Sequence, residues 1–306
     1  MGIRSKISIG TYYYDFPNFG DQLTGLIMTE CFHLKIRYTP FSTSDLIAVG
    51  SIFDRLLSKG RLGKKEKEYQ KKANKKHAIH VWGSGLMYEY DAAENQLVRP
   101  VRIHAVRGEA TRQKISEILG RSVSCVLADP GILASRIIPA GEKQWDVGII
   151  PHFRDKSMPV FQEMLEVYPN SVFIDVQQNP EIVLKQISQC RKTISTSLHG
   201  IIVSDSYNIP CCWVECSNNV PGSGYKFHDY FSSFGTDRDA FDVRDGTLPD
   251  PAVHCVSSFH SYSDVLRKQA ELIRCFPATT LILMECGRRI KRKLKKMISS
   301  LFSGKN

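Results

Sequence analysis

The sequence lacks a long apolar run, a secretory leader and paired cysteine motifs. No stretch approaches the ~20 apolar residues that a membrane-spanning helix needs. The first ten residues contain no hydrophobic segment of the length found in signal peptides. The nine cysteines are an odd number, and no two are spaced as Cys-x-x-Cys. This usage favours a reducing cytoplasm, and we expect no metal site.

Acidic residues are few relative to basic ones. The chain has 41 lysines and arginines against 31 aspartates and glutamates, which gives a net charge of +10. This balance predicts an anionic partner, either a phosphorylated substrate, a nucleic acid or an acidic membrane surface. Two segments concentrate the excess, residues 59–77 and residues 288–296. The first is interpreted as a solvated surface segment that is also a candidate patch facing phospholipid or phosphate.

Strand-like and helical patterns alternate along most of the chain in two blocks, separated by an expected linker at 136–144. The alternation predicts an α/β fold with two doubly wound, Rossmann-like domains that face each other across a cleft, as in glycosyltransferase-B enzymes. We expect an N-terminal domain at 1–139, a C-terminal domain with the donor site at 140–277, and a separate tail at 278–306.

Loops rich in glycine and polar residues follow several predicted strands. The carboxyl edge of a parallel sheet is where open α/β folds bind ligands. Glycine in such a loop lets a ligand approach the backbone closely. The candidate binding residues in these loops are Asn18, Gly20, Asp21, Gly83, Ser84 and Gly85. Asp21 is equally suited to cap the helix that follows it.

Arg107 ends the predicted strand at 101–107 and precedes a helix. In that position a guanidinium is placed to hold a phosphate or carboxylate through two hydrogen bonds. The alternative is an ordinary surface ion pair with Glu109.

The segment at 191–210 places hydroxyls and an imidazole between a strand and a helix. Ser195 and Ser197 precede His199, and Gly200 follows it, ahead of a helical run that opens with 201–203. Backbone N–H groups at a helix start favour an anion, and the imidazole is suited to proton transfer. The competing interpretation is a buried strand-to-helix corner whose histidine is only hydrogen-bonded.

This segment resembles the signature of the polysaccharide pyruvyl transferase family, in which a serine-rich turn carries an essential histidine. Further matching pieces occur in the family's order over roughly residues 5 to 277. They are Asn18-Phe-Gly-Asp21, Trp82-Gly-Ser-Gly85, Val106-Arg-Gly-Glu109, Asp129-Pro-Gly131, Ile150-Pro-His152 and Lys226-Phe-His-Asp-Tyr230.

The resemblance implies a reaction between phosphoenolpyruvate and a sugar with two suitably spaced hydroxyls, which yields a cyclic pyruvate ketal and phosphate. It implies proton transfer by His199 and His152, and anion binding by Arg107 and Lys226. Phosphoenolpyruvate is then a co-substrate, and neither a further cofactor nor a metal is expected. Many family members carry arginine two residues before the histidine, where this chain has Ser197. Another cation must take that role, and Lys226 or Arg154 is the expected substitute.

The tail combines seven basic residues at 288–296 with apolar residues at helical spacing, namely Ile290, Leu294, Ile298 and Leu301. This pattern predicts a basic amphipathic helix that lies on an anionic membrane. It suggests a lipid-linked acceptor and a cytoplasmic protein held at the inner face of the cell membrane. A solvated, disordered tail is the alternative. No recognised nucleic-acid-binding module accompanies the charge, so nucleic acid is not an expected partner.

Two other functions stay open. A glycosyltransferase that uses a nucleotide sugar would employ His199 as base and the helix start to hold the diphosphate. A non-enzymatic membrane-bound or nucleic-acid-binding protein would instead depend on the basic segments alone and show salt-sensitive binding.

Overall fold

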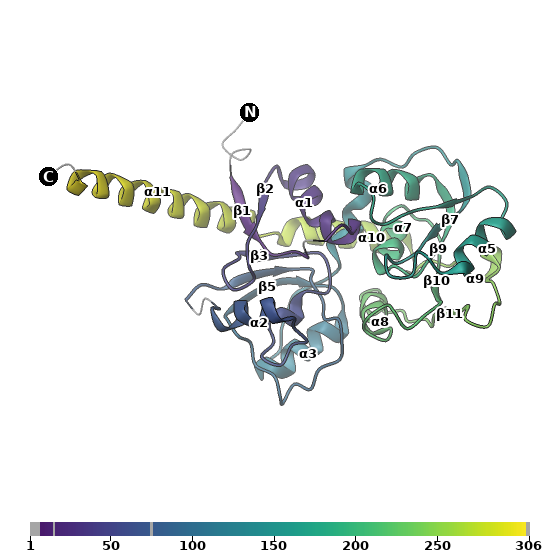
Figure 1. The fold of residues 1–306 in the computed structure, drawn as a ribbon, viewed down its shortest axis with the longest axis horizontal. Helices are drawn as coiled ribbons and strands as arrows, with labels where there is room; N and C mark the ends of the chain where they lie inside the picture. Colours follow the sequence, from purple (N-terminus) through teal and green to yellow (C-terminus); the bar gives the residue numbers. More distant parts are fainter. Residues whose placement is uncertain (1–6, 15, 74–75, 304–306) are drawn as a thin grey trace.

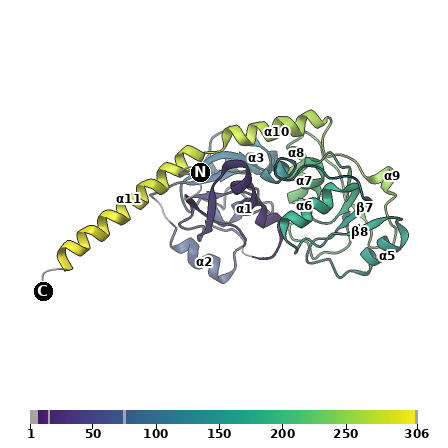
Figure 2. The same cartoon turned by 90° about the horizontal axis from the view of Figure 1, so that it is seen from above.

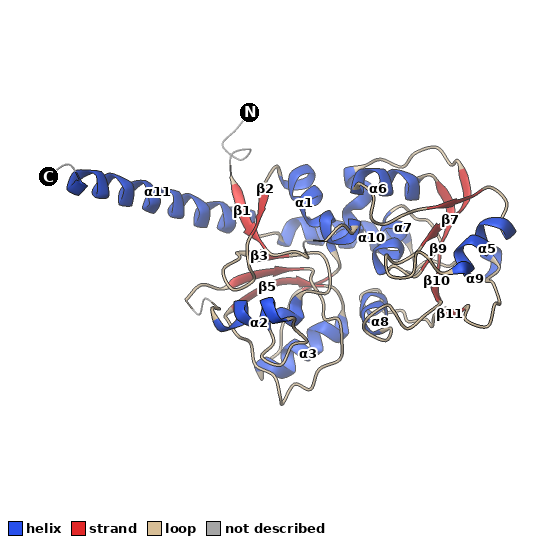
Figure 3. Cartoon of the chain, in the orientation of Figure 1, coloured by secondary structure: helices blue, strands red, loops and turns tan. Residues whose placement is uncertain are grey.

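The fold contains two parallel β-sheets, each with helices packed against it (Figures 1 and 3). The computed structural model describes residues 7–14, 16–73 and 76–303, with side chains described as far as residue 296. The predicted α/β class with two parallel sheets is confirmed.

The first sheet has the strand order β2-β1-β3-β4-β5-β6, with parallel pairing throughout. Its strands are β1 (Ser8–Thr11), β2 (Lys35–Tyr38), β3 (Leu46–Ile47), β4 (Ile79–Trp82), β5 (Val101–Val106) and β6 (Val126–Leu127). Its connecting helices are α1 (Phe19–Phe32), the 3₁₀ turn η2 (Phe53–Leu56), α2 (Lys64–Lys71), α3 (Glu109–Leu119), η3 (Pro130–Leu133) and α4 (Ala134–Ile137). Since the strands are parallel, their carboxyl ends meet along one edge.

The second sheet has the order β11-β10-β9-β7-β8, also parallel. Its strands are β7 (Trp145–Ile150), β8 (Ser171–Phe173), β9 (Cys190–Ser195), β10 (Cys211–Glu215) and β11 (Phe241–Asp242). Its helices are α5 (Pro159–Val167), α6 (Pro180–Ser188), α7 (Leu198–Ser206), α8 (Tyr225–Ser232) and α9 (Pro251–His254). The central strand β9 leads into α7, which carries the histidine that the sequence singles out.

One apolar core extends across both sheets. It includes Ile9 of β1 and Leu23 of α1 as well as Ile202 of α7 and Trp213 of β10. Helix α1 contacts α6, and α7 contacts η3. The backbone N–H of Phe19 also donates to the carbonyl of Val176 at 2.8 Å. The two carboxyl edges are thus held against each other by packing that is continuous with both cores.

Helix α10 (Tyr262–Cys275) connects the second sheet back to the first (Figure 2). At its start, the Tyr262 hydroxyl donates to the carbonyl of Ser206 in α7. Further along, Lys268 donates to the carbonyl of Leu127 at 2.6 Å, and the Trp82 indole donates to the carbonyl of Leu272 at 3.0 Å. The sequence expectation placed this helix in the C-terminal domain, whereas most of its length covers β5, β6 and η3 of the first sheet.

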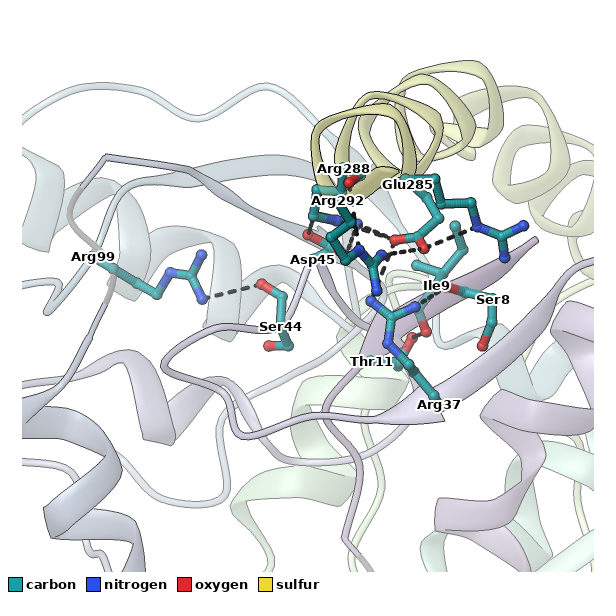
Figure 4. Close-up of polar contacts among 11 residues, drawn as sticks. Ser8, Ile9, Thr11, Arg37, Ser44, Asp45, Arg99, Glu285, Arg288 and Arg292 are labelled. Carbon is teal, nitrogen blue, oxygen red and sulfur yellow. Dashed lines mark hydrogen bonds and ion pairs between the residues drawn. The ribbon is translucent and has the colours of Figure 1, made fainter. Parts of the chain in front are cut away.

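Helix α11 (Ala278–Ser303) is docked at its base and extends away from the body of the molecule (Figures 1 and 2). Leu281 is buried, and the helix contacts β1. The buried Glu285 carboxylate pairs with Arg37, Arg288 and Arg292, at 3.3, 3.0 and 2.9 Å. Arg288 also makes two hydrogen bonds of 2.7 Å to Asp45 (Figure 4). The expected tail at 278–306 is therefore helical over 278–303, and its first turns pack against the first sheet.

Beyond the docked base, Ile290 is 59% exposed and Leu294 is 47% exposed. The side chains of Ile298 and Leu301, which complete the predicted apolar stripe, lie outside the described part of the chain. None of the described helices combines the length and the apolar character that crossing a bilayer requires.

Candidate functional site

A cavity of about 270 Å³ lies between the carboxyl edges of the two sheets. From the first half it is lined by Tyr14, Asn18, Asp21, Gly50, Ser51, Ile52, Arg55, Arg61, Met87 and Tyr88. From the second half it is lined by His152, Phe153, Arg154, Ser197, Leu198, His199, Pro221 and Lys226. This is the place where open α/β sheets bind ligands. It brings together two imidazoles, four cationic side chains and one carboxyl group.

His199 lies in the first turn of α7, two residues after the N-cap residue Ser197. Its Nε2 is buried, and no described group forms a hydrogen bond with it. Burial, reinforced by the nearby charges of Lys226 and Arg107, lowers the pKa of His199 to about 3. The imidazole is therefore neutral at physiological pH. A buried ring nitrogen without a partner in the wall of a cavity is suited to a ligand that completes its hydrogen bonding.

His152 follows β7 and faces the same cavity. Its backbone N–H donates to the Thr196 hydroxyl at 2.7 Å, which ties the β7 and β9 loops together. Its Nδ1 accepts from the backbone N–H of Arg154 at 3.3 Å. That bond leaves Nε2 as the protonated nitrogen of the neutral ring. Burial, together with the positive charges of Lys226 and Arg154, lowers the pKa of His152 to about 3.

Four cations surround the cavity, and they differ in how they are held. Lys226 of α8 is buried, and burial together with Arg107 and Arg154 lowers its pKa to about 7, against the opposing effect of Asp21 and Asp155. The Arg55 guanidinium donates to Glu66 at 2.9 Å.

The other two cations are exposed, and both lie over aromatic rings. The Arg61 guanidinium is 4.1 Å from the centre of the Tyr88 ring, and Arg154 is 5.8 Å from the centre of the Phe153 ring. An anion entering the cavity would thus meet one buried ammonium and three guanidinium groups.

Asp21 supplies the carboxyl group of the cavity from the first half of the chain. It lies in the first turn of α1, where Asn18 donates to its Oδ2 at 2.7 Å. Burial raises the pKa of Asp21 to about 6, while the bond from Asn18 and the charges of Arg55 and Lys226 oppose the rise. The expected role as a capping residue is not the one observed, since Asn18 occupies the N-cap position and its side chain bonds Asp21 instead of the backbone.

Arg107 does not line the cavity, which corrects the expectation of a direct contact with substrate. Its side chain is 0% exposed. Its Nε and Nη2 both approach Asp229 Oδ2, at 2.9 and 2.8 Å, and Nη1 donates to Ser51 at 2.6 Å. Glu109, the alternative partner, is paired with Arg112 instead. The guanidinium is held in an ion pair that links the end of β5 to α8. A buried charge of this kind needs a countercharge and hydrogen bonds to offset the cost of its burial.

The predicted glycines and two of the predicted serines serve packing in place of ligand contact. A Cβ on Gly20 would lie 2.1 Å from His199 Nδ1, and one on Gly85 would lie 2.4 Å from the Arg107 guanidinium. Gly83 has φ +90°, and a Cβ there would strike Pro130. Gly200 packs against Ser195, whose hydroxyl bonds the carbonyl of Ile150 at 2.9 Å. Ser84 bonds the carbonyl of Gly50 at 2.9 Å.

The six predicted residues that do reach the cavity are Asn18, Asp21, His152, Ser197, His199 and Lys226. Sequence reasoning missed Arg55 and Arg61, and it named Arg154 only as a substitute cation. Arg55 lies in η2, within the segment that follows β3, so the same strand-end rule that selected the other loops applied to it. Arg61 belongs to the basic segment at 59–77, which gave no sign of which of its charges turns inward.

Comparisons with known proteins identify the family of the chain. The chain is similar to "Uncharacterized protein L143" of Acanthamoeba polyphaga mimivirus, with 35% identity over 143 residues. That match covers 45% of this chain and 50% of the relative, so the chain spans about half the length of the curated relative it matches. No solved structure gives a significant match. A family profile described as polysaccharide pyruvyl transferase matches residues 7–218, which include every cavity residue but Pro221 and Lys226. The chain belongs to the polysaccharide pyruvyl transferase family.

Proposed function

We propose that this protein transfers the enolpyruvyl group of phosphoenolpyruvate onto two hydroxyls of a sugar, forming a cyclic pyruvate ketal and releasing phosphate. The observation that carries the proposal is the composition of the cavity between the two sheets, where four cations surround two neutral imidazoles. The family indicates polysaccharide pyruvyl transfer in general. The two sheets facing across this cavity support the glycosyltransferase-B-like arrangement that the sequence suggests.

Phosphoenolpyruvate carries its negative charge on a phosphate and a carboxylate. Lys226 and Arg154 line the second half of the cavity, while Arg55 and Arg61 approach from the first half. The two pairs are suited to hold the two anionic ends of one small molecule. Ser197 has no charge, so Lys226 and Arg154 together take the role of the arginine that many relatives carry at that position. The N-terminus of α7 adds a favourable dipole.

The reaction begins when the methylene carbon of phosphoenolpyruvate takes up a proton, which leaves positive charge on the carbon that bears the phosphate. One sugar hydroxyl attacks this carbon, the carbon–oxygen bond to phosphate breaks, and the second hydroxyl then closes the ring. The two hydroxyl protons balance the proton placed on carbon and the proton that leaves with phosphate. The chemistry therefore needs one acid and one base close together.

His199, His152 and Asp21 are the groups placed for these proton transfers. In the free protein both imidazoles are neutral, because burial and nearby cations lower the pKa of each to about 3. An anion bound beside them favours the imidazolium and raises the pKa of each ring. Asp21, with a pKa of about 6, exists in both protonation states near neutral pH. Substrate binding thus converts a weakly basic site into one that can deliver a proton.

Measuring phosphate release from phosphoenolpyruvate tests the proposal. We expect release that depends on an added sugar acceptor and fails with nucleotide sugars as donors. His199→Gln should reduce the rate at least a hundredfold, since a positioned proton-transfer group typically contributes 10²–10⁴. His33→Gln is the matched control, because His33 caps α1 by its backbone and does not line the cavity. Transfer from a nucleotide sugar, with none from phosphoenolpyruvate, would assign the site to glycosyl transfer.

We further propose that α11 holds the protein at the anionic inner face of the cell membrane, where a lipid-linked acceptor would be found. The support is the docked base at Glu285 together with exposed Ile290 and Leu294 among basic residues. Such a helix binds through apolar burial plus attraction to anionic headgroups. Co-sedimentation with phosphatidylserine-containing vesicles should be lost on deletion of 288–306. Unchanged sedimentation of the truncated chain would rule out this anchor.

A further inference from the structure

A second pocket, of about 280 Å³, opens beside the first cavity at the carboxyl edge of the second sheet. The end of β10 and the following loop form most of it, and Asp155 and Thr196 close it from the neighbouring β7 and β9 loops. The residues that line it are Asp155, Thr196, Trp213, Val214, Glu215, Cys216, Ser217, Asn218, Val220, Ser223, Gly224 and Phe227. Its volume lies near the lower end of the roughly 300–1,000 Å³ that small-molecule sites occupy.

Asp155 is the buried charge of this pocket. Its side chain is 0% exposed, and its Oδ1 accepts from the Ser217 hydroxyl at 2.6 Å. Its Oδ2 is buried without a hydrogen-bond partner among the described groups. A buried acceptor left unsatisfied costs about 1–3 kcal/mol, and more when it is charged. A ligand that donates a hydrogen bond from inside the pocket would remove that cost.

The pocket offers acceptors and no cations. Glu215 at the end of β10 is the second acidic residue of the lining. No lysine or arginine belongs to the lining of this pocket, in contrast to the four around the first cavity. Lys226 and Arg244 interact with the charges of Asp155 and Glu215, but neither belongs to the lining. Acidic side chains are therefore the charged groups that a ligand inside the pocket contacts, and they disfavour phosphate or pyrophosphate groups. Both carboxylates can accept hydrogen bonds from the hydroxyls of a neutral sugar ring.

The two pockets adjoin each other along four short stretches of the chain. Four pairs of consecutive residues contribute one member to each pocket, and they are Arg154 and Asp155, Thr196 and Ser197, Val220 and Pro221, and Lys226 and Phe227. Neighbouring residues are only about 3.8 Å apart along the chain. A ligand that fills one pocket therefore ends within reach of the other. Two linked sugar rings would span them.

We infer that this second pocket binds the sugar ring next to the one that receives the pyruvyl group, so that the acceptor is at least a disaccharide. The inference rests on the proposed function, because it places the modified ring in the first cavity. Asp155 and Glu215 then select for neutral, hydroxyl-rich units at the neighbouring position. Trp213 and Val220 supply apolar surface for the ring's carbon face.

The test titrates the protein with methyl glycosides and disaccharides of glucose, galactose, mannose and N-acetylglucosamine, using tryptophan fluorescence, and measures the KM of each sugar in phosphate release. We expect at least one disaccharide to bind about tenfold more tightly than its monosaccharides. Glu215→Gln and Asp155→Asn should each raise that disaccharide's KM about tenfold without a matching rise for phosphoenolpyruvate. Glu163→Gln, on the exposed face of α5, is the matched control and should change neither value.

Several outcomes would overturn the inference. These are equal binding of monosaccharides and disaccharides, binding of none of these sugars, or saturable binding of Mg²⁺ or Ca²⁺ that Glu215→Gln abolishes. Disaccharide preference without phosphate release from phosphoenolpyruvate would retain the sugar pocket and reject the pyruvyl transfer. Phosphate release with free monosaccharides alone, at full rate, would retain the transfer and reject the second pocket.

Discussion

Arg107 and Asp229 form a fully buried ion pair between strand β5 and helix α8, with nitrogen-to-oxygen distances of 2.9 and 2.8 Å. Asp229 also accepts the backbone N–H and the hydroxyl of Thr111, at 2.8 and 2.7 Å. Lys226 lies one turn earlier in α8 and reaches the cavity. The pair therefore fixes the helix that carries the cavity's buried cation, and Arg107 acts as a positioning residue.

Breaking this pair should be costly. Asp229→Asn leaves the buried guanidinium of Arg107 without its countercharge, and such changes typically cost about 3–5 kcal/mol. Urea unfolding monitored by circular dichroism would measure the loss. Glu109→Gln, which breaks the partly exposed pair with Arg112, is the control and should cost less than about 1 kcal/mol. Equal losses for the two variants would contradict the assigned role of Arg107.

Gly20→Ala should disturb the imidazole of His199 directly. The added methyl would lie 2.1 Å from Nδ1, so the ring must move out of its place. We expect a loss of about 1–3 kcal/mol in unfolding free energy, as for other overpacked sites, and a lower rate of phosphate release. Gly25→Ala in the same helix has 3.5 Å to its nearest side chain and should stabilise α1 by about 0.5–1 kcal/mol. If Gly20→Ala changed neither the unfolding free energy nor the rate, the His199 imidazole would not be held against Gly20.

Phosphoenolpyruvate binding should take up protons. Lys226 has a lowered pKa of about 7, so it is partly deprotonated in the free protein at pH 7.5. A bound anion raises this pKa and those of the two imidazoles, and the affinity should fall as pH rises above about 7, by up to tenfold per pH unit for each proton taken up. Calorimetry in two buffers of different ionisation enthalpy measures the uptake. Lys226→Arg keeps a fixed charge and should reduce it, whereas unchanged uptake would remove Lys226 from the anion site.

Glu285→Gln should loosen the base of α11. The carboxylate neutralises Arg37, Arg288 and Arg292, which would otherwise repel one another. We expect faster amide hydrogen exchange at 278–290 and a loss of roughly 1–3 kcal/mol, because the arginines are partly solvated. Glu271→Gln, in the exposed pair with Arg267, is the control. Unaltered exchange would mean that Leu281 and its apolar neighbours alone dock the helix.

Local patterns predicted the elements whose boundaries depend on local residues. The strands at 145–150 and 211–215 are both rich in apolar residues, and local residues mark their ends, Pro151 after the first and Glu215 at the end of the second. The sequence pattern at 123–129 allows a longer strand, but β6 is paired only over Val126–Leu127. Its outer residues lie at the sheet edge, where hydrogen bonding to a single neighbour decides the length.

Pairings between distant residues could not be read from the chain. Arg107 has the sequence context of a phosphate-binding residue, but its partner Asp229 is 122 residues away. The serine-rich turn has the same ambiguity, because Ser195 satisfies backbone groups whereas Ser197, two residues on, faces the cavity. Residue type and strand-end position select the right loops. Which side chain of a loop turns inward depends on packing from the opposite half.

Because α10 packs on the first sheet, that sheet cannot be fully covered until most of the chain has been synthesised. The indole N–H of Trp82 donates to the carbonyl of Leu272, which is synthesised 190 residues later. At a synthesis rate of about 5–20 residues per second, α10 becomes available to pack on the first sheet roughly 10–40 s after Trp82 has been added. During that interval the face formed by β5 and β6 is open to chaperones and to other nascent chains. Truncations that stop short of α10 should therefore aggregate during translation even when the first sheet is intact in sequence.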